Sequence, residues 1–184
     1  MPNIEYDTLA GILCHILSSC HSFNPRFYYL CHSLYIHMNT EKDLYYMKEA
    51  LKMAQIAYDS NEVPVGAILV LNDRIISKSG NMVESLRDST AHAEMIAITS
   101  ALSAYDSKAM PGATLYVTLE PCPMCASAMN HSNIRRLVYG AEDLKGGFSK
   151  YSPSLLHPKC QVISGIMKEE CSALIIDFFK KLRK

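Results

Sequence analysis

Apolar and polar positions alternate regularly only in the part of the chain that follows Met38. Apolar residues after Thr40 recur every three or four positions, as they do along one face of an α-helix. They are Leu44, Met47, Leu51, Ala54 and Tyr58. Thr40 precedes Glu41 and Asp43, an order typical of a helix N-cap with an acidic first turn. The pattern predicts a helix that begins at Thr40.

Two apolar runs, 65–71 and 74–78, predict strands joined by a tight turn at Asn72 and Asp73. Further along, the pattern predicts a helix from about residue 91, a strand from 114, a helix from 122, a strand over 136–139, a short strand near 161–163 and a helix from about 168. Strands that alternate with helices in this way indicate an α/β fold, with helices on both faces of a sheet.

Residues 141–159 are expected to form a loop. They contain Gly146, Gly147, Pro153 and Pro158, which interrupt regular structure. A long loop inside a compact domain is typically functional. We therefore expect this segment to contribute to a site.

Residues 1–37 have a different character. Cys-His pairs at 14–15, 20–21 and 31–32 allow a second metal site, although their spacing matches no recognisable zinc module. Glu5 and Asp7 stand where a signal peptide would carry a basic region. We interpret 1–37 as an N-terminal extension, poorly ordered or outside the functional protein, and 38–184 as the functional domain.

Composition is that of one globular domain, since 49% of the 184 residues are hydrophobic and 20% are charged. No uninterrupted apolar run approaches the ~18 residues that a membrane helix needs, so no membrane partner is expected. The seven cysteines are an odd number without a disulfide framework. This usage favours the reducing cytoplasm.

Two short segments carry the candidate chemistry. His92 and Glu94 open one predicted helix, while Cys122 and Cys125 follow Pro121 at the start of another. Zinc binds Cys and His, and a site with three protein ligands leaves a fourth position for water, as in catalytic centres. His92, Cys122 and Cys125 are therefore predicted zinc ligands, with Glu94 free to face the water.

Each segment alone has another interpretation. A Cys-x-x-Cys after a strand also suits a thioredoxin-like redox motif. A His-x-Glu is commonly a core histidine followed by a solvated glutamate. The combination favours zinc, because it is similar to the His-x-Glu and Pro-Cys-x-x-Cys signature of zinc deaminases.

The resemblance extends from about residue 44 to the C-terminus, and its pattern is that of the bacterial tRNA-specific adenosine deaminase family. The segments that carry it, besides the signature, are Glu62–Ala67, Thr114–Cys122, Ala128–Ser132, Gly165–Met167, Glu170–Leu174 and Asp177–Phe179. It implies a cytidine-deaminase-like three-layer α/β/α sandwich with a mixed sheet of about five strands.

The resemblance also implies roles. It implies one zinc ion per subunit, Glu94 as the catalytic acid and base, and Asn81 as a contact to the flipped base, although Asn81 could be only a turn residue after Gly80. Glu120 could support the ligands or be only a strand-end carboxylate. A homodimer is expected, which pairs through the apolar helix faces around Cys122 to Met129, including Met124 and Met129.

The net charge of the chain does not indicate a nucleic-acid partner, so only local clusters of basic residues can. The chain carries 18 basic and 18 acidic residues, yet nucleic-acid binding requires a basic footprint. The candidates for contact with the tRNA anticodon loop are Lys145, Lys150, Lys180, Lys181 and Arg183. The last three could instead compensate a helix dipole.

We therefore expect a zinc-dependent hydrolase that converts adenosine to inosine at the anticodon wobble position of tRNA. The first alternative is a small-molecule deaminase that acts on guanine, cytosine or nucleosides, because the same zinc chemistry serves all of these substrates. The second is a non-catalytic zinc or redox module.

Overall fold

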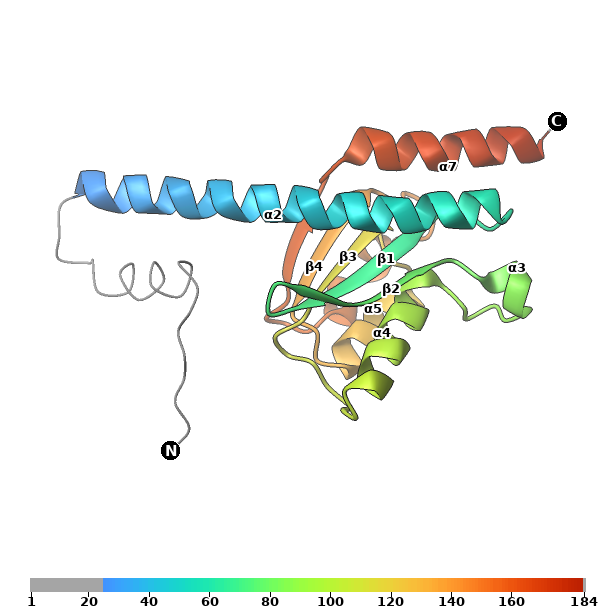
Figure 1. Ribbon diagram of the computed structural model, residues 1–184, viewed down its shortest axis with the longest axis horizontal. Helices are drawn as coiled ribbons and strands as arrows, with labels where there is room; N and C mark the ends of the chain where they lie inside the picture. Colours follow the sequence, from blue (N-terminus) through green and yellow to red (C-terminus); the bar gives the residue numbers. More distant parts are fainter. Residues whose placement is uncertain (1–24, 184) are drawn as a thin grey trace. The chain divides into compact units, whose positions relative to one another are not determined.

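The structure is a computed structural model that describes residues 25–183, with side chains from Thr40 onward (Figure 1). The chain divides into two units, 1–43 and 44–184, and the fold described here is that of the second. The side chains of the three N-terminal Cys-His pairs lie outside the described part. The proposed domain boundary at residue 38 stays a prediction.

The predicted first helix is present, but its predicted beginning was wrong. Helix α2 spans Pro25–Asp59 and passes through Thr40 without interruption. The sequence between Pro25 and Thr40 contains neither Gly nor Pro, so nothing in it ends a helix. Within the second unit, Met47 and Ala54 of this helix are fully buried.

Five strands form one mixed sheet, which confirms the predicted fold class. The strands are β1 (Gly66–Leu71), β2 (Arg74–Gly80), β3 (Thr114–Leu119), β4 (Arg136–Ala141) and β5 (Gln161–Ser164), in the order β2-β1-β3-β4-β5. β1 is antiparallel to β2 and to β3, whereas β3, β4 and β5 are parallel. Asn72 and Asp73 both have positive φ angles, 50° and 57°, as the tight turn between β1 and β2 requires.

Helices cover both faces of the sheet (Figure 1). α4 (Ala93–Ala104) and α5 (Pro123–His131) lie on one face, and residues 44–59 of α2 lie with α7 (Lys168–Leu182) on the other. Alternate residues of β1 face the two layers: Leu69 packs in the core with α4 and α5, and Ile68 packs in the core with α2 and α7. The result is the predicted three-layer sandwich.

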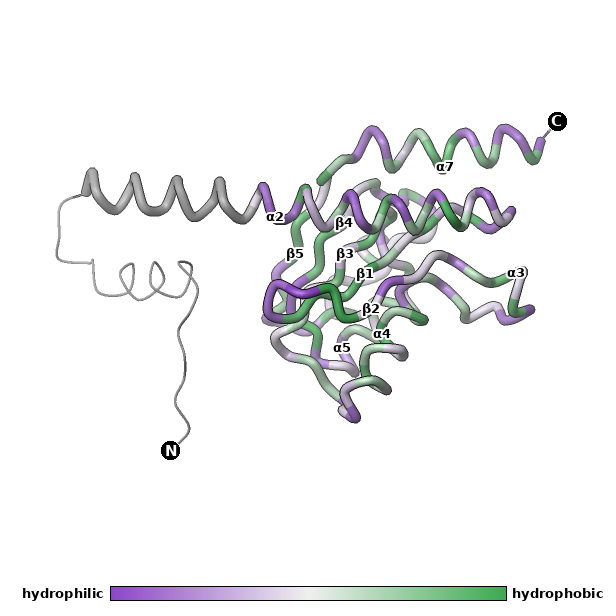
Figure 2. Tube along the Cα trace, in the orientation of Figure 1, coloured by the Kyte–Doolittle hydropathy of each residue, from purple (hydrophilic) through white to green (hydrophobic). Residues whose placement is uncertain are grey.

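The hydropathy of the elements matches this layering. The middle strands are mostly hydrophobic, because both of their faces are buried, and α7 alternates hydrophobic and hydrophilic residues along its length (Figure 2).

Met129 of α5 is fully buried in the core of its own chain. The expectation that Met129 lies on a dimer interface was therefore wrong. Among the described residues, no helix is both long enough and apolar enough to cross a membrane.

One end of the sheet collects the segments that carry polar side chains. β1 begins there, and β2, β3 and β4 end there, because Ala67 pairs with Ser79 and Val117, and Leu119 pairs with Ala141. The short α3 (Val83–Leu86) follows β2, while α6 (Phe148–Tyr151) and the 3-10 helix η2 (Pro153–Leu155) lie in the predicted loop after β4. In open α/β sheets, this carboxyl end is the usual place for a ligand.

Candidate active site

The three predicted zinc ligands come from the first turns of two neighbouring helices. His92 is the N-cap residue of α4, and Cys122 is the N-cap residue of α5. Pro123 occupies the first position of α5, where the N–H that proline lacks would have no helical partner. Cys125 lies further along the same first turn. Both helices thus direct their positive ends toward the group, which favours thiolate sulfur.

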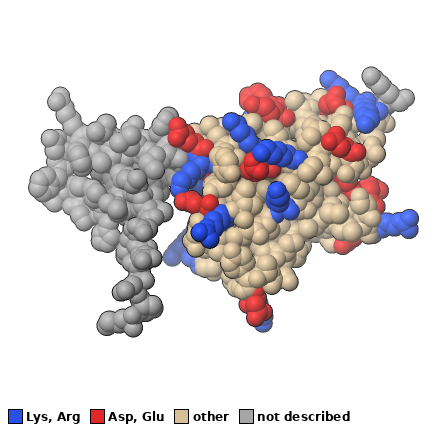
Figure 3. All heavy atoms as spheres, in the orientation of Figure 1, with Lys and Arg blue, Asp and Glu red and all other residues tan. Residues whose placement is uncertain are grey.

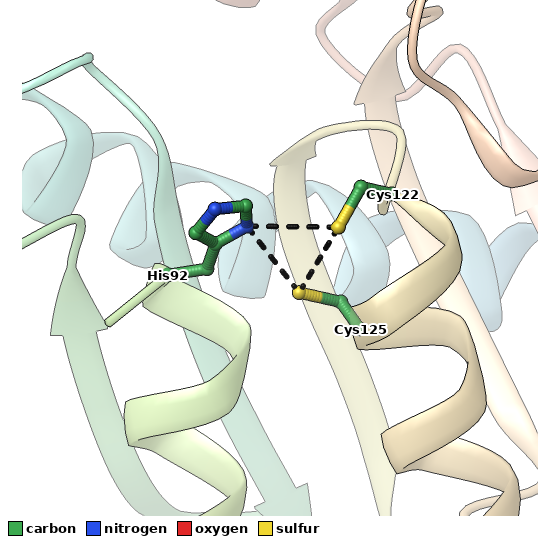
Figure 4. A group of neighbouring side chains, drawn as sticks. All are labelled: His92, Cys122 and Cys125. Atoms are coloured by element: carbon green, nitrogen blue, oxygen red, sulfur yellow. Dashed lines mark hydrogen bonds between the residues drawn. The ribbon is translucent and has the colours of Figure 1, made fainter. Parts of the chain in front are cut away.

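The side chains of His92, Cys122 and Cys125 point toward one another (Figure 4). His92 Nδ1 lies 3.6 Å from the Sγ atoms of both cysteines, and the two Sγ atoms are 3.7 Å apart. A tetrahedral zinc with Zn–S bonds of about 2.3 Å and Zn–N bonds of about 2.0–2.1 Å places its ligand atoms roughly 3.5–3.8 Å apart. The three side chains therefore have the spacing that a single zinc ion requires.

The protonation of the two thiols is unequal. The pKa of Cys122 is lowered to about 4, chiefly by its hydrogen bond with Cys125 and further by His92, against the opposing effect of burial. The pKa of Cys125 is raised by the same pairing and by burial. Two neighbouring sulfurs next to an imidazole form a donor set that suits a divalent cation of the zinc class better than an isolated thiol would.

Glu94 lies beside this group without belonging to it. Its side chain is only 3% exposed, and burial raises the pKa of its carboxyl. A buried carboxyl whose pKa is raised can both accept and return a proton, as general acid–base catalysis requires. The position of Glu94 therefore suits proton transfer.

A cavity of about 290 Å³ opens in front of the group, with His92, Glu94 and Cys122 among its lining residues. Its apolar walls come from Val63, Val65, Val83 and Leu119, and its other polar residues are Glu62, Asn81, Glu84, Glu120 and Asp143. The volume is close to the lower end of the roughly 300–1,000 Å³ range of small-molecule sites. It suits a single nucleobase better than a large ligand.

Asn81 is only 7% exposed and lines this cavity, so it is more than a solvent-facing turn residue. Its Nδ2 donates a hydrogen bond of 3.1 Å to Glu62 Oε2. Glu62 had no role in the sequence prediction. A carboxylate immediately before the apolar run that begins at Val63 is the signal that could have indicated one.

Glu120 does not stand free at the strand end, and its carboxylate binds the loop after β4 and not the zinc ligands. Its Oε2 accepts a hydrogen bond of 3.1 Å from the backbone N–H of Asp143, and its Oε1 accepts one of 3.0 Å from that of Ser149. Its side chain is buried. Glu120 therefore fixes the loop after β4 next to the cavity.

A second cavity, of about 640 Å³, adjoins the first and shares Val63, Leu119 and Asp143 with it. Two of the predicted RNA-contact residues, Lys145 and Arg183, line this second cavity together with Phe179 of α7.

The other predicted RNA contacts lie elsewhere. Lys150 Nζ donates to the backbone oxygen of Lys145, Lys181 Nζ lies 5.3 Å from the centre of the Tyr58 ring, and Lys180 is exposed on α7. On the face shown in Figure 3, basic and acidic side chains are interspersed rather than separated into one basic patch. The basic side chains on this face therefore form no continuous footprint.

Comparison with known proteins agrees with this geometry. A family model described as the cytidine and deoxycytidylate deaminase zinc-binding region matches residues 40–141. The tRNA-specific adenosine deaminase of Bacillus subtilis (strain 168) is 46% identical over 148 residues, which cover 78% of this chain and 92% of that protein. The tRNA-specific adenosine deaminase of Agrobacterium fabrum is 44% identical over 144 residues, which cover 76% and 95% of the two chains.

Solved structures give the same picture. A structure from a study of A-to-I editing by tRNA deaminases at the wobble position of transfer RNA is 44% identical, covers 71% of this chain and 98% of that one, and has a TM-score of 0.66. A guanine deaminase from Nitrosomonas europaea has a TM-score of 0.64 over 72% of this chain and 81% of its own, but at 22% identity it shows only that the fold is shared.

Proposed function

Because the chain belongs to the family defined by the cytidine and deoxycytidylate deaminase zinc-binding region, we propose that it is a zinc-dependent hydrolase that deaminates adenosine to inosine in tRNA. The observation that carries the chemistry is the triangle of His92, Cys122 and Cys125, with its zinc-like spacing, beside the buried Glu94 and a cavity of base size. The observation that carries the substrate is the similarity to tRNA-specific adenosine deaminases over most of the chain.

We propose that His92, Cys122 and Cys125 hold one zinc ion. When bound, zinc lowers the pKa of a water toward about 7 and so supplies a nucleophile at neutral pH. Glu94 accepts the proton of the attacking water and passes it to the ring nitrogen beside the reacting carbon. It then assists the proton transfer to the departing amine. The sum is one water consumed, one ammonia released and one carbonyl formed on the base, with Glu94 returned to its starting state.

Asn81 is proposed to bind the adenine base. It lines the same cavity as Glu94, and its carboxamide retains hydrogen-bonding capacity beyond the bond to Glu62. A base in a tRNA loop has to leave its stack to enter such a cavity, which favours a substrate whose other nucleotides also bind.

The second cavity supports an RNA substrate in preference to a free base. A free base fills one cavity, whereas a loop places neighbouring nucleotides beside it. Phe179 offers a ring on which a base can stack, and Lys145 and Arg183 offer charge for phosphate. We propose that these residues contact the anticodon loop around the wobble position. The proposed contacts through Lys150, Lys180 and Lys181 have weaker support, since none of them lines either cavity.

We further propose that residues 38–184 form the deaminase domain, that two copies form a homodimer, and that the enzyme works in the cytoplasm, where tRNA is used. The exposed apolar side chains of the segment after β4 support the dimer. Leu144 and Tyr151, both in the loop after β4, are 81% and 62% exposed. Covering such exposed apolar side chains with a second chain is favourable, because it removes apolar surface from water.

The test of the function uses the purified full chain with an anticodon stem-loop that carries adenosine at the wobble position. We expect ammonia release and one inosine per stem-loop at that position. A stem-loop with guanosine at the wobble position is the matched control and should release no ammonia. Free guanine, cytosine, adenosine and cytidine are assayed in parallel. Turnover of one of these with none of the stem-loop would replace the proposal by the small-molecule alternative.

A further inference from the structure

Glu62 is a buried carboxylate that the mechanism above does not use. It lies between α2 and β1, lines the 290 Å³ cavity and is only 1% exposed. Burial of a charged group costs free energy unless hydrogen bonds compensate. The contacts of Glu62 therefore indicate why the chain keeps a carboxylate at this position.

The carboxylate of Glu62 accepts four hydrogen bonds. Oε1 accepts from the backbone N–H and the Oγ of Ser85, both at 2.7 Å. Oε2 accepts from the backbone N–H of Glu84 at 3.2 Å and from Asn81 Nδ2 at 3.1 Å. Burial raises the pKa of the Glu62 carboxyl, but these hydrogen bonds outweigh it, so the pKa lies below its usual value. Glu62 is therefore ionised at neutral pH and only accepts.

An acceptor on this side determines how Asn81 is oriented. The carboxamide of an asparagine has an oxygen end and a nitrogen end of nearly equal size. Only the nitrogen end can face the carboxylate of Glu62, which leaves the oxygen and the second N–H for other partners. The backbone of Asn81 is also held, because its N–H donates to the carbonyl of Val65 at 2.9 Å. Asn81 thus presents one defined hydrogen-bonding pattern.

We propose that Glu62 is a positioning residue for deamination: its carboxylate fixes the orientation of the Asn81 carboxamide in the substrate cavity. The inference rests on the proposed function, in which Asn81 binds the base. Glu62 acts through Asn81, so its contribution to catalysis should exist only when residue 81 is asparagine.

The substitution Glu62→Gln tests this. Glutamine has the same shape but one acceptor and one donor end. If its oxygen keeps the two bonds from Ser85, its amide meets Asn81 Nδ2, and two donors face each other. Asn81 is then expected to rotate and to present the opposite pattern to the base. We expect kcat/KM for the stem-loop to fall by up to about 100-fold, the scale of a misplaced binding group.

A double-mutant cycle separates positioning from stability. Asn81→Ala should lower kcat/KM, and adding Glu62→Gln should cause no further loss, because the coupled side chain is gone. A carboxylate with a purely structural role would lower kcat/KM by the same factor in both backgrounds. Zinc content and unfolding temperature are measured for all four proteins. Glu49→Gln is the matched control. It makes the same chemical change at a residue of α2 that pairs with Lys52 and lines neither cavity.

Two results would overturn the proposal: an equal loss in both backgrounds, or no loss from Glu62→Gln alone. If Glu62→Gln does not fold, the cycle is run with Glu62→Asp, which keeps the charge and withdraws it from Asn81 by one methylene group. Failure of the unmodified chain to deaminate any stem-loop would contradict the proposed function instead, so the two failures are distinguishable.

Discussion

Gly147 lies directly against the carboxylate of Glu120. A Cβ atom on residue 147 would stand 2.4 Å from Glu120 Cδ and 2.5 Å from its Oε2, closer than side chains approach one another. The φ and ψ angles of Gly147, −63° and 147°, are ones that any residue adopts, so the requirement for glycine here is steric. The glycine lets the loop after β4 close over the carboxylate that holds it.

The first prediction concerns this contact. Gly147→Ala should displace Glu120 and weaken its bonds to the backbone of Asp143 and Ser149, at a cost of about 1–3 kcal/mol in the free energy of unfolding. Urea unfolding measures the loss. Gly112→Ala is the matched control, because a Cβ there would meet only Leu71 Cδ1, at 3.4 Å. Equal stability of the two variants would contradict the steric explanation.

The second prediction concerns Glu94. Glu94→Gln should keep the zinc and lower kcat by about 100- to 10,000-fold, because the amide fills the same space but cannot accept the proton of the water. Metal analysis and single-turnover deamination of the stem-loop measure the two effects separately. Loss of zinc from the variant would make Glu94 a ligand, and retained activity would refute its role in proton transfer.

The third prediction concerns the metal. A strong zinc chelator should abolish deamination and lower the unfolding temperature, and added Zn²⁺ should restore both, because an ion bound only by the folded chain stabilises it. Cys122→Ser should lose zinc by metal analysis. Cys160→Ser is its control, since Cys160 is a half-buried free thiol outside the three-ligand group. Zinc retained by Cys122→Ser would remove Cys122 from the ligand set.

The parts of the fold that the sequence predicted are those with strong local patterns. The hairpin at Asn72 and Asp73 depends on two adjacent residues, and the ligand spacing of Cys122 and Cys125 depends on one helical turn that follows a strand. The predicted beginning of α2 was wrong. Thr40 and the acidic residues after it are typical of an N-cap, but the residues before Thr40 contain nothing that ends a helix.

The interactions that the sequence did not predict depend on tertiary contacts. Glu62 and Glu120 both accept hydrogen bonds from backbone N–H groups more than twenty residues away, and no spacing in a sequence encodes such a partner. Lys181 was grouped with Arg183 by position alone, whereas α7 directs Lys181 toward the ring of Tyr58 and places Arg183 at the second cavity. A sequence shows how many basic side chains a helix carries, but not the direction in which each of them points.

The fourth prediction concerns the proposed homodimer. Sedimentation should show a dimer, with an interface that buries more than about 1,000 Å² in total. Leu144→Ser with Tyr151→Ser should shift the equilibrium toward monomer, because these exposed side chains are proposed to be covered. Leu86→Ser is the control, since Leu86 is an exposed apolar residue on α3 outside the loop after β4. A fully active monomer at every concentration would contradict the proposed assembly.

The last prediction separates an RNA substrate from a free base. Lys145→Ala with Arg183→Ala should weaken stem-loop binding and flatten its dependence on salt, because each lost phosphate contact lowers the slope of log affinity against log salt by about 0.7 for a single strand. Lys180→Ala with Lys181→Ala removes the same charge from α7 outside the second cavity, and should change the slope less. Zinc content should be equal in both variants. Equal slopes for the two pairs would mean that charge alone, and not the second cavity, attracts the RNA. An unchanged slope in both would remove these four residues from the binding surface.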